Sequence, residues 1–176
     1  MRKISQNVRL NSLPSPKIQK IIKEMKTALA SQDDGVALAA PQIGYPLRIF
    51  VISKKVFEMT KTTKKDFVDV SKKNTGEINQ KKDIAFINPV FKKMSKEKKI
   101  IEEGCLSVRF LYGKVQRSDK AIVEAYDENG KKFTHGGSGL LAQIFQHEID
   151  HLNGILFTDK AKYVEEIIPK TRAVKK

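Results

Sequence analysis

Hydrophobic residues recur at helical spacing close to the N-terminus of the chain. They begin directly after Ser15-Pro16, and proline is favoured at the first position of a helix. The spacing places these residues on one side of an α-helix. We therefore predict an amphipathic helix from Ser15 to Ala30, with its apolar side in the core. The residues of this apolar stripe are Ile18, Ile21, Ile22, Met25 and Leu29.

Short apolar runs bounded by polar and turn-forming residues predict strands at five places. Glu128-Asn129-Gly130 has the composition of a hairpin turn and joins the third strand to the fourth. The predicted strands are Arg48–Ser53, Ile84–Phe91, Ala121–Tyr126, Lys131–Thr134 and a short one at Gly154–Phe157.

A second helix is predicted from about Ser138 to Leu152, where Asn153-Gly154 provides a left-handed stop. Most of the remaining order comes from strands joined by short connections, which favours antiparallel pairing. The pattern as a whole predicts the α+β class: mostly antiparallel strands around a central helix, with another helix near the N-terminus.

The length of 176 residues fits one domain, and we expect residues 1–176 to form it. The Lys- and Thr-rich stretch 54–83 predicts an insertion or long surface loop, with Asp66–Val70 as a candidate short element inside it. Residues 160–176 form a basic tail, in which Pro169 argues against one long helix.

The composition limits the classes of protein to which the chain can belong. No apolar run approaches the roughly 18 residues of a membrane span, and the N-terminus lacks the apolar region of a secretory signal. A single cysteine excludes an internal disulfide and fits a reducing compartment. The net charge of +14 favours an acidic partner such as RNA or a ribosome surface, but a lysine-rich solvated surface explains it equally well. The lysines are spread over loops with few aromatic residues between them, which argues against specific DNA recognition.

His147 and His151 in the segment QHEIDHLNG carry the strongest chemical signal. On a helix, residues four positions apart lie on the same face. Two imidazoles at this spacing hold one metal ion in many hydrolases, and the glutamate between them, here Glu148, serves as the general base. The chain has only 3 histidines, so this spacing indicates a metallohydrolase site.

Two histidines require a third protein ligand. Cys105, the only cysteine, is the first candidate, although a lone cysteine is more often a small buried hydrophobic residue. Asp150 and His135 compete with it. Asp150 lies about a quarter-turn off the metal face, and His135 stands in a glycine-rich turn with no partner at ligand spacing.

Three separate segments are similar, in the same order, to the three signature motifs of the peptide deformylases. They are Gly35–Gln42 (GVALAAPQ), Glu103–Ser107 (EGCLS) and Gln146–His151 (QHEIDH). Two positions depart from the family pattern. Ala37 replaces the second glycine of the first motif, and Arg109 with its neighbours follows EGCLSV where proline and glycine are common in the family.

The resemblance implies a metal site and an activity. Cys105, His147 and His151 would hold a divalent metal ion, Fe²⁺ in the native state, with Zn²⁺, Ni²⁺ or Co²⁺ able to replace it. The substrate would be the N-formyl-methionine end of a nascent polypeptide, and formate would be released. Glu148 would move the proton of the attacking water. The side-chain amide of Gln42 and the backbone N–H of Leu106 would stabilise the oxyanion.

The resemblance also implies a pocket for the methionine side chain. Leu140 and Ile144 precede His147 on the same helix face and are suitable walls. Gln143 replaces an apolar residue, and its pocket-facing and surface-facing orientations are equally plausible. The other residues expected at the substrate are Gly35, Val36, Ala37, Glu103 and Gly104.

Carboxylates are expected to orient the metal-binding histidines. Glu103 and Asp150 are the candidates for this role, and Arg109 or Arg117 is the candidate partner of Glu103.

Together these features predict a metal-dependent peptide deformylase that acts in a bacterial-type cytosol, with an organelle or a phage-infected cell left open. Its partners would be N-formyl-methionyl chains, and its basic charge predicts docking near the ribosomal exit tunnel. An RNA- or ribosome-binding protein on the same scaffold is the competing hypothesis, supported by the charge and by Ala37. A protease that cuts internal peptide bonds is a third, against which the intact EGCLS motif argues.

Overall fold

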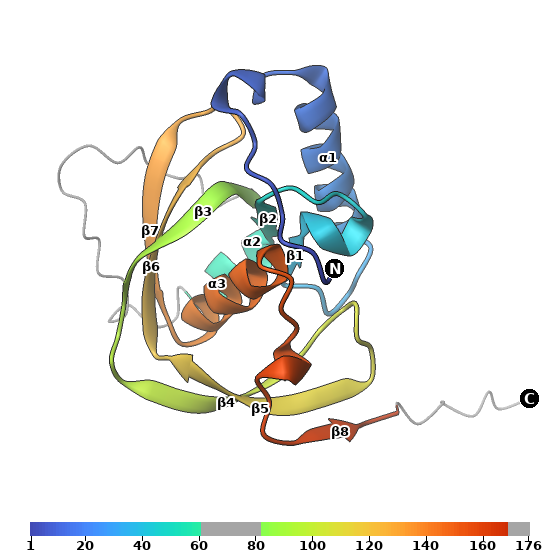
Figure 1. Cartoon of the computed structure of the whole chain (residues 1–176), viewed down its shortest axis with the longest axis vertical. Coiled ribbons are helices and arrows are strands. Elements are labelled where there is room, and N and C mark those ends of the chain that lie inside the picture. Colours follow the sequence, from blue (N-terminus) through green and yellow to red (C-terminus); the bar gives the residue numbers. More distant parts are fainter. Residues whose placement is uncertain (61–81, 169–176) are drawn as a thin grey trace, which may run out of the picture.

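A computed structural model of the protein describes residues 1–60 and 82–168. Two antiparallel sheets and the helix α3 (Gly139–Leu152) form the main part of this described structure (Figure 1). The larger sheet has the strand order β1-β2-β3-β6-β7 and the smaller one β4-β5-β8. Helix α3 packs against strands of both sheets. This arrangement confirms the predicted α+β class. The strands are β1 (Ala37–Ala39), β2 (Ile49–Ile52), β3 (Ile84–Met94), β4 (Lys98–Gly104), β5 (Leu111–Ser118), β6 (Lys120–Tyr126), β7 (Lys132–Ser138) and β8 (Val164–Glu166).

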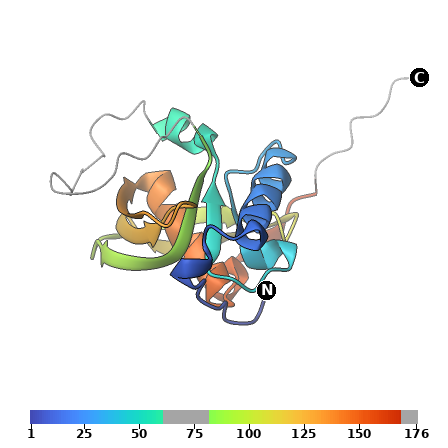
Figure 2. The same cartoon turned by 90° about the horizontal axis from the view of Figure 1, so that it is seen from above.

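The N-terminal helix α1 spans Pro16–Ala30 (Figures 1 and 2). The side chains of its predicted apolar stripe are buried. The Ser15 hydroxyl oxygen accepts a hydrogen bond from the backbone N–H of Ile18, which satisfies one of the free amides of the first turn. The prediction for this segment is therefore confirmed. The described parts of the chain also contain short 3-10 helices at Leu10–Ser12, Ala40–Ile43 and Phe157–Asp159.

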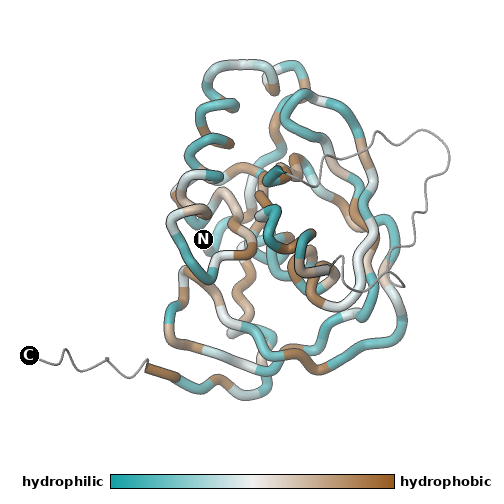
Figure 3. The backbone as a smooth tube through the Cα atoms, turned by 180° about the vertical axis from the view of Figure 1, so that it is seen from behind, coloured by the Kyte–Doolittle hydropathy of each residue, from teal (hydrophilic) through white to brown (hydrophobic). Residues whose placement is uncertain are grey.

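Strands β1 and β2 are buried on both faces of the larger sheet. Phe50 and Ile52 join the core on the α3 side, whereas Ile49 and Val51 join the core beneath α1. A strand covered on both faces is apolar throughout instead of alternating. This explains the uninterrupted apolar run IFVI of β2. Helix α1, in contrast, has one face on the core, and most of its outward turns are hydrophilic (Figure 3).

Aromatic packing fixes α3 against the larger sheet. The ring of Phe86 stacks on Phe50 at a centroid distance of 4.7 Å and meets the edge of Phe133 at 5.0 Å. Phe145 of α3 packs on the same ring at 5.4 Å. Since Phe145 holds one side of the helix in the core, the side that carries His147 and His151 turns towards the smaller sheet.

Two of the predicted segments differ in the structure. Residues Lys54–Thr60, expected in a loop, form helix α2, because Val56 and Phe57 are buried against the core. The rest of the predicted insertion through residue 81, including Asp66–Val70, lies outside the described residues. The predicted strand at 154–157 is wrong: Gly154 adopts φ +75° against the backbone of Arg2, and a 3-10 helix begins at Phe157.

Strand β3 continues beyond its predicted end to Met94. Asn88 has a positive φ of 51°, and the register with β6 shifts between Ile87 and Val90. This bulge accommodates Pro89, which has no N–H to donate to the sheet.

Four strands were not predicted from the sequence. β1 and β8 have three residues each, and β4 and β5 carry many charged residues. Within the predicted basic tail, β8 is the acidic segment Val-Glu-Glu and pairs with β5, while Pro169 lies outside the described residues. Among the helices of the described parts of the chain, none is long and apolar enough to cross a bilayer.

Candidate metal centre and its pocket

Helix α3 and the end of strand β4 bring together one thiol and two imidazoles. The rings of His147 and His151 have centroids 4.8 Å apart. Cys105, the residue directly after β4, places its Sγ 3.2 Å from Nε2 of His151. The potential ligand atoms of these three residues all lie within 4.8 Å of one another.

The two other candidates for third ligand lie elsewhere. Asp150 forms ion pairs with Arg117 and Lys160. His135 is buried among aromatic rings, with Phe57 at a centroid distance of 5.7 Å and Phe145 at 6.0 Å. Of the three candidates for the third ligand, Cys105 is therefore the one that the structure places beside the histidine pair.

The three donor atoms fit a tetrahedral metal ion. Ligands at the usual Zn–N and Zn–S bond lengths are separated by roughly 3.5 Å. The 3.2 Å between Cys105 Sγ and His151 Nε2 is close to this value, and all three donor atoms lie within 4.8 Å of one another. One thiolate and two imidazoles suit Fe²⁺ or Zn²⁺ and are poor ligands for Mg²⁺ or Ca²⁺. The donor set therefore has the chemistry of a transition-metal site with one open position.

A buried carboxylate orients His147. Oε2 of Glu103 lies 3.0 Å from Nδ1 of His147, which directs the Nε2 of this ring to the ligand cluster. Glu103 also accepts two hydrogen bonds from Arg117, with Nε at 2.7 Å and Nη2 at 2.8 Å. This geometry confirms the predicted contact between Glu103 and a metal-site histidine, and it identifies Arg117 as the partner of Glu103.

Arg117 links this carboxylate to a second one. Its Nη1 donates to Asp150 at 2.6 Å, and Lys160 donates to both carboxylate oxygens of Asp150 at 2.6 and 2.7 Å. Asp150 therefore acts on the site through Arg117, and among the described residues its side chain bonds to Arg117 and Lys160 and to no histidine. The side chains of Arg117 and Glu103 are 3% and 1% exposed, so this ion pair is shielded from water.

The pKa of Glu103 predicts how the stability of the protein depends on pH. Burial raises this pKa, but hydrogen bonds from Arg117 and His147 outweigh it and lower the pKa from 4.5 to about 2. The unfolded chain therefore binds this proton first as the pH falls. The stabilisation is complete above about pH 4.5 and is lost progressively as the pH falls towards about 2.

We expect urea unfolding of the metal-free protein at pH 5, 4 and 3 to show this loss. The Glu103→Gln variant should show a slope shallower by up to about 1.4 kcal/mol per pH unit, one proton's worth. Equal slopes for the two proteins would contradict the low pKa of Glu103.

Glu148 lies beside the ligand cluster and is buried. Burial raises the pKa of Glu148 from 4.5 to about 7, although the neighbouring His147 opposes the shift. Its Oε2 has no hydrogen-bond partner among the described residues. A carboxyl with a pKa near neutrality can both accept and return a proton, which is the property required of a general base.

The two histidines differ in how readily they hold a proton. Burial lowers the pKa of His151 to about 3, with the charge of His147 adding to the effect. Burial also disfavours the charged form of His147, but hydrogen bonds with Cys105 and Glu103 raise its pKa to about 10. Because a metal-binding imidazole must be neutral, we expect metal binding to release protons from this cluster.

The side-chain amide of Gln42 is held in a single orientation at the edge of the cluster. Its Oε1 accepts a hydrogen bond from the backbone N–H of Ala39 at 2.7 Å. Its Nε2 therefore faces the site, where it donates to Ser107 Oγ at 2.9 Å and lies 3.6 Å from Cys105 Sγ. The 3-10 helix Ala40–Ile43 carries Gln42 to this position.

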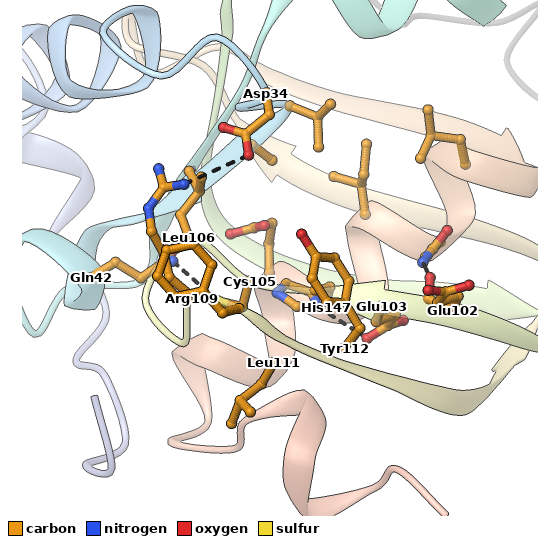
Figure 4. A pocket seen from close by; sticks show the side chains of 18 residues that line it. Asp34, Gln42, Glu102, Glu103, Cys105, Leu106, Arg109, Leu111, Tyr112 and His147 are labelled. Carbon is orange, nitrogen blue, oxygen red and sulfur yellow. Dashed lines mark hydrogen bonds and ion pairs between the residues drawn. The ribbon is translucent and has the colours of Figure 1, made fainter. Parts of the chain in front are cut away.

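A pocket of about 440 Å³ opens over the metal cluster (Figure 4), within the usual size range of ligand sites. Most of the residues expected at the substrate line it. Gly35 does not: it packs beside Leu29 and Gln32. Gln143 does, and its Nε2 donates to the backbone carbonyl of Glu102 at 3.0 Å. The predicted residues along the pocket wall are Val36, Ala37, Gln42, Glu103, Gly104, Cys105, Leu106, Leu140, Gln143, Ile144, His147 and Glu148.

Sequence reasoning missed several residues of the site. Gln146 forms hydrogen bonds to both the N–H and the C=O of Ser118 and so ties α3 to the end of β5. Tyr112 also lines the pocket, with its ring over Gly104. The signature motifs contain Gln146 and Ser107, which was a usable signal. Tyr112 and Lys160 lie outside these motifs, and only the fold brings them to the site.

The His–His–Cys cluster, the buried carboxyl beside it and the pocket above define a metal-dependent hydrolase. The sequence profile of the family described as polypeptide deformylase matches residues 1–166. Peptide deformylase 2 of Clostridium acetobutylicum is 40% identical over 143 residues, which are 81% of this chain and 78% of the relative. The chain belongs to the polypeptide deformylase family, whose members remove the N-formyl group from new polypeptides.

Solved structures agree with this assignment. A peptide deformylase from Legionella pneumophila superposes with a TM-score of 0.70 at 37% identity, over 92% of this chain and 79% of the other. A class I type b peptide deformylase from Acinetobacter baumannii, crystallised with Met-Ala-Ser, gives a TM-score of 0.71 at 28% identity, with 90% of both chains covered.

Proposed function

We propose that the metal cluster and its pocket remove the formyl group from N-formyl-methionyl polypeptides, and that residues 1–176 act as one catalytic domain. Cys105, His147 and His151 hold the divalent metal ion, for which Fe²⁺ is the native candidate and Zn²⁺, Ni²⁺ or Co²⁺ are substitutes. A bound ion would supply Lewis-acid chemistry, which makes the formyl carbon more electrophilic and the attacking water more acidic.

Glu148 moves the protons of the reaction. Its carboxylate takes a proton from the attacking water and delivers it to the leaving amine of the methionine, so that formate and a free amino terminus are produced. The pKa of about 7, raised by burial, supports this role because both protonation states are accessible near neutral pH.

Gln42 and Leu106 stabilise the oxyanion that forms at the formyl carbon. The amide of Gln42 is prevented from rotating by its bond to Ala39, so its N–H groups remain directed at the site without reorganisation. Leu106 follows Cys105 directly and lines the same pocket. Donors that are oriented in advance stabilise developing charge more than mobile ones do.

The methionine side chain enters the apolar part of the pocket. Leu140 and Ile144 form its walls on α3, and Val36, Ala37 and Gly104 line the same pocket. Gln143 remains compatible with an apolar ligand, because its amide is occupied by the carbonyl of Glu102. The relative crystallised with Met-Ala-Ser supports a peptide of this kind as the ligand.

The observation that carries the proposal is the cluster of Cys105 with the two histidines beside the buried Glu148. The test is formate release from formyl-Met-Ala-Ser by protein purified without oxygen and loaded with Fe²⁺ or Ni²⁺. Turnover that disappears when Cys105→Ala prevents stoichiometric metal binding would support it. Full metal occupancy without any formate release would instead favour the RNA- or ribosome-binding hypothesis.

Replacement of Gln42 with alanine should lower kcat about 10²-fold, because one oxyanion donor is lost. Peptide binding should change little, since the donor acts mainly in the transition state. Steady-state kinetics on formyl-Met-Ala-Ser will measure both quantities. An increase in KM at constant kcat would assign Gln42 to substrate binding instead.

From the net charge of +14 we also propose the ribosome as a partner, with the protein docked near the exit tunnel. The substrate chemistry places the reaction where formylated chains are synthesised, a bacterial-type cytosol or an organelle. Co-sedimentation with ribosomes at physiological salt tests the docking, and a protein that remains in the supernatant would contradict it.

A further inference from the structure

Arg109 supplies the guanidinium among the described residues that line the pocket, and it lies beside Asp34 (Figure 4). Nη1 of Arg109 lies 3.7 Å from Oδ2 of Asp34, and Nη2 donates a hydrogen bond to Oε1 of Gln32. The side chains of Arg109 and Asp34 are 45% and 69% exposed. The ion pair is therefore long and solvated, so an incoming group can replace one partner at little cost.

The described lining of the pocket is otherwise rich in carboxylates. It contains four acidic side chains and no lysine, although the whole chain carries a charge of +14. Glu103 is neutralised by Arg117, and Glu148 is buried beside the metal cluster. At the rim this leaves Asp34 and Glu102 against Arg109. The charge of Arg109 thus decides whether the rim is strongly negative.

The backbone fixes the position of Arg109. The N–H of Val108 donates to the carbonyl of Cys105 at 3.1 Å, and the carbonyl of Phe110 accepts from the N–H of Ile167 at 2.8 Å. Phe110 adopts φ +67°, which turns the chain directly after Arg109. Because backbone bonds hold both flanks, a substitution at Arg109 changes the charge of the rim without removing what orders the loop.

The chemistry of the pocket sets the path of a bound peptide. The formyl group lies at the metal cluster and the methionine side chain between Leu140 and Ile144, so the chain leaves through the polar rim. In an extended peptide, alternate side chains point to the same face and lie about 7 Å apart. The side chain of the third residue therefore returns to the face that received methionine. Arg109 and Asp34 line the same pocket and are the charged groups available to it there.

We propose that Arg109 determines specificity for the third residue of the substrate by accepting an acidic side chain there. The inference rests on the proposed function of the same site. An incoming carboxylate replaces Asp34 as the partner of Arg109, whereas an incoming ammonium meets a like charge. Without Arg109, the unbalanced Asp34 and Glu102 would favour a basic side chain.

The experiment compares kcat/KM for formyl-Met-Ala-Glu and formyl-Met-Ala-Lys. We expect the wild type to prefer the glutamate peptide about fivefold, and Arg109→Gln to reverse this preference with a change of about tenfold in the ratio. The effect should appear in KM and diminish at 0.5 M salt, because exposed charges are screened. Asp34→Asn, which frees Arg109, should raise the ratio about threefold.

Three controls make the result specific. Lys131→Gln removes an exposed positive charge on the turn before β7 and should leave the ratio unchanged. Placing the charge on the second residue, in formyl-Met-Glu-Ala and formyl-Met-Lys-Ala, should give a much smaller response to Arg109→Gln. Calorimetric binding of the third-position peptides to the Glu148→Ala variant should show the same preference without turnover.

The outcomes separate the two proposals. If the wild type hydrolyses formyl-Met-Ala-Gln but shows the same Glu-to-Lys ratio as Arg109→Gln, the inference about Arg109 is wrong and the deformylase function stands. If no formyl peptide is hydrolysed or bound by the metal-loaded protein, the proposed function itself fails. A ratio that changes equally in Lys131→Gln would assign the effect to overall charge and overturn the role of Arg109.

Discussion

Replacement of Glu148 with alanine is expected to lower the rate of formate release by at least about 10³-fold while the metal ion stays bound. The reaction needs a group that removes a proton from water and returns it to the leaving amine. Glu148 is the buried carboxyl adjacent to the ligand cluster, and its pKa of about 7 suits both transfers. Its Oε2 has no partner among the described residues, so no described interaction has to break before it acts.

The measurement is single-turnover formate release by wild type, Glu148→Ala and Glu148→Gln, each with its metal content determined. Glu148→Gln is the matched control because it preserves the volume of the side chain and removes the ionisable group. Both variants should bind one equivalent of metal and both should be inactive. Substantial turnover by Glu148→Gln would mean that another group moves the proton.

Replacement of Arg117 with methionine is expected to destabilise the protein by about 3–5 kcal/mol. Arg117 is almost completely buried and donates three hydrogen bonds to two carboxylates, those of Glu103 and Asp150. Its removal leaves two buried negative charges, whose remaining side-chain partners in the described parts of the chain are His147 and Lys160. This loss of stability is larger than the net contribution of an intact ion pair to the free energy of unfolding, because the remaining buried charges cannot be rehydrated.

Urea unfolding at pH 7 without added metal measures this change directly. Lys132→Met provides the control. Lys132 also forms an ion pair, with Glu124, but its side chain is 55% exposed. That variant should lose less than about 1 kcal/mol. If both variants are destabilised equally, burial of the Arg117 network contributes nothing specific.

The same Arg117→Met variant should bind its metal ion about 10–100-fold more weakly, because Glu103 then orients His147 less firmly. Competition with a chromophoric chelator measures the affinity. Unchanged affinity together with the expected loss of stability would restrict Arg117 to a structural role and separate it from the metal site.

Local patterns in the sequence were sufficient to predict part of the fold and part of the candidate site. The stripe of α1, the apolar run of β2 and the spacing of His147 and His151 each depend on neighbouring positions of one element. For this reason the α+β class and the metal-binding helix could be predicted directly. The EGCLS segment also identified Cys105 as the leading third ligand, although its distance from the histidines along the chain left Asp150 and His135 open.

Other features depend on contacts between segments far apart in the chain. β4 and β5 carry charged residues because one face of the smaller sheet is exposed, and their pairing places Arg117 between Glu103 and Asp150. Helix α2 forms because the core accepts Val56 and Phe57. Arg109 meets Asp34 only because two loops border the same pocket. The sequence by itself determined the chemistry of the candidate metal ligands, since one helix turn and one motif contain it. The tertiary structure decided which charges are buried, paired or free, because burial and distance are properties of the assembled fold.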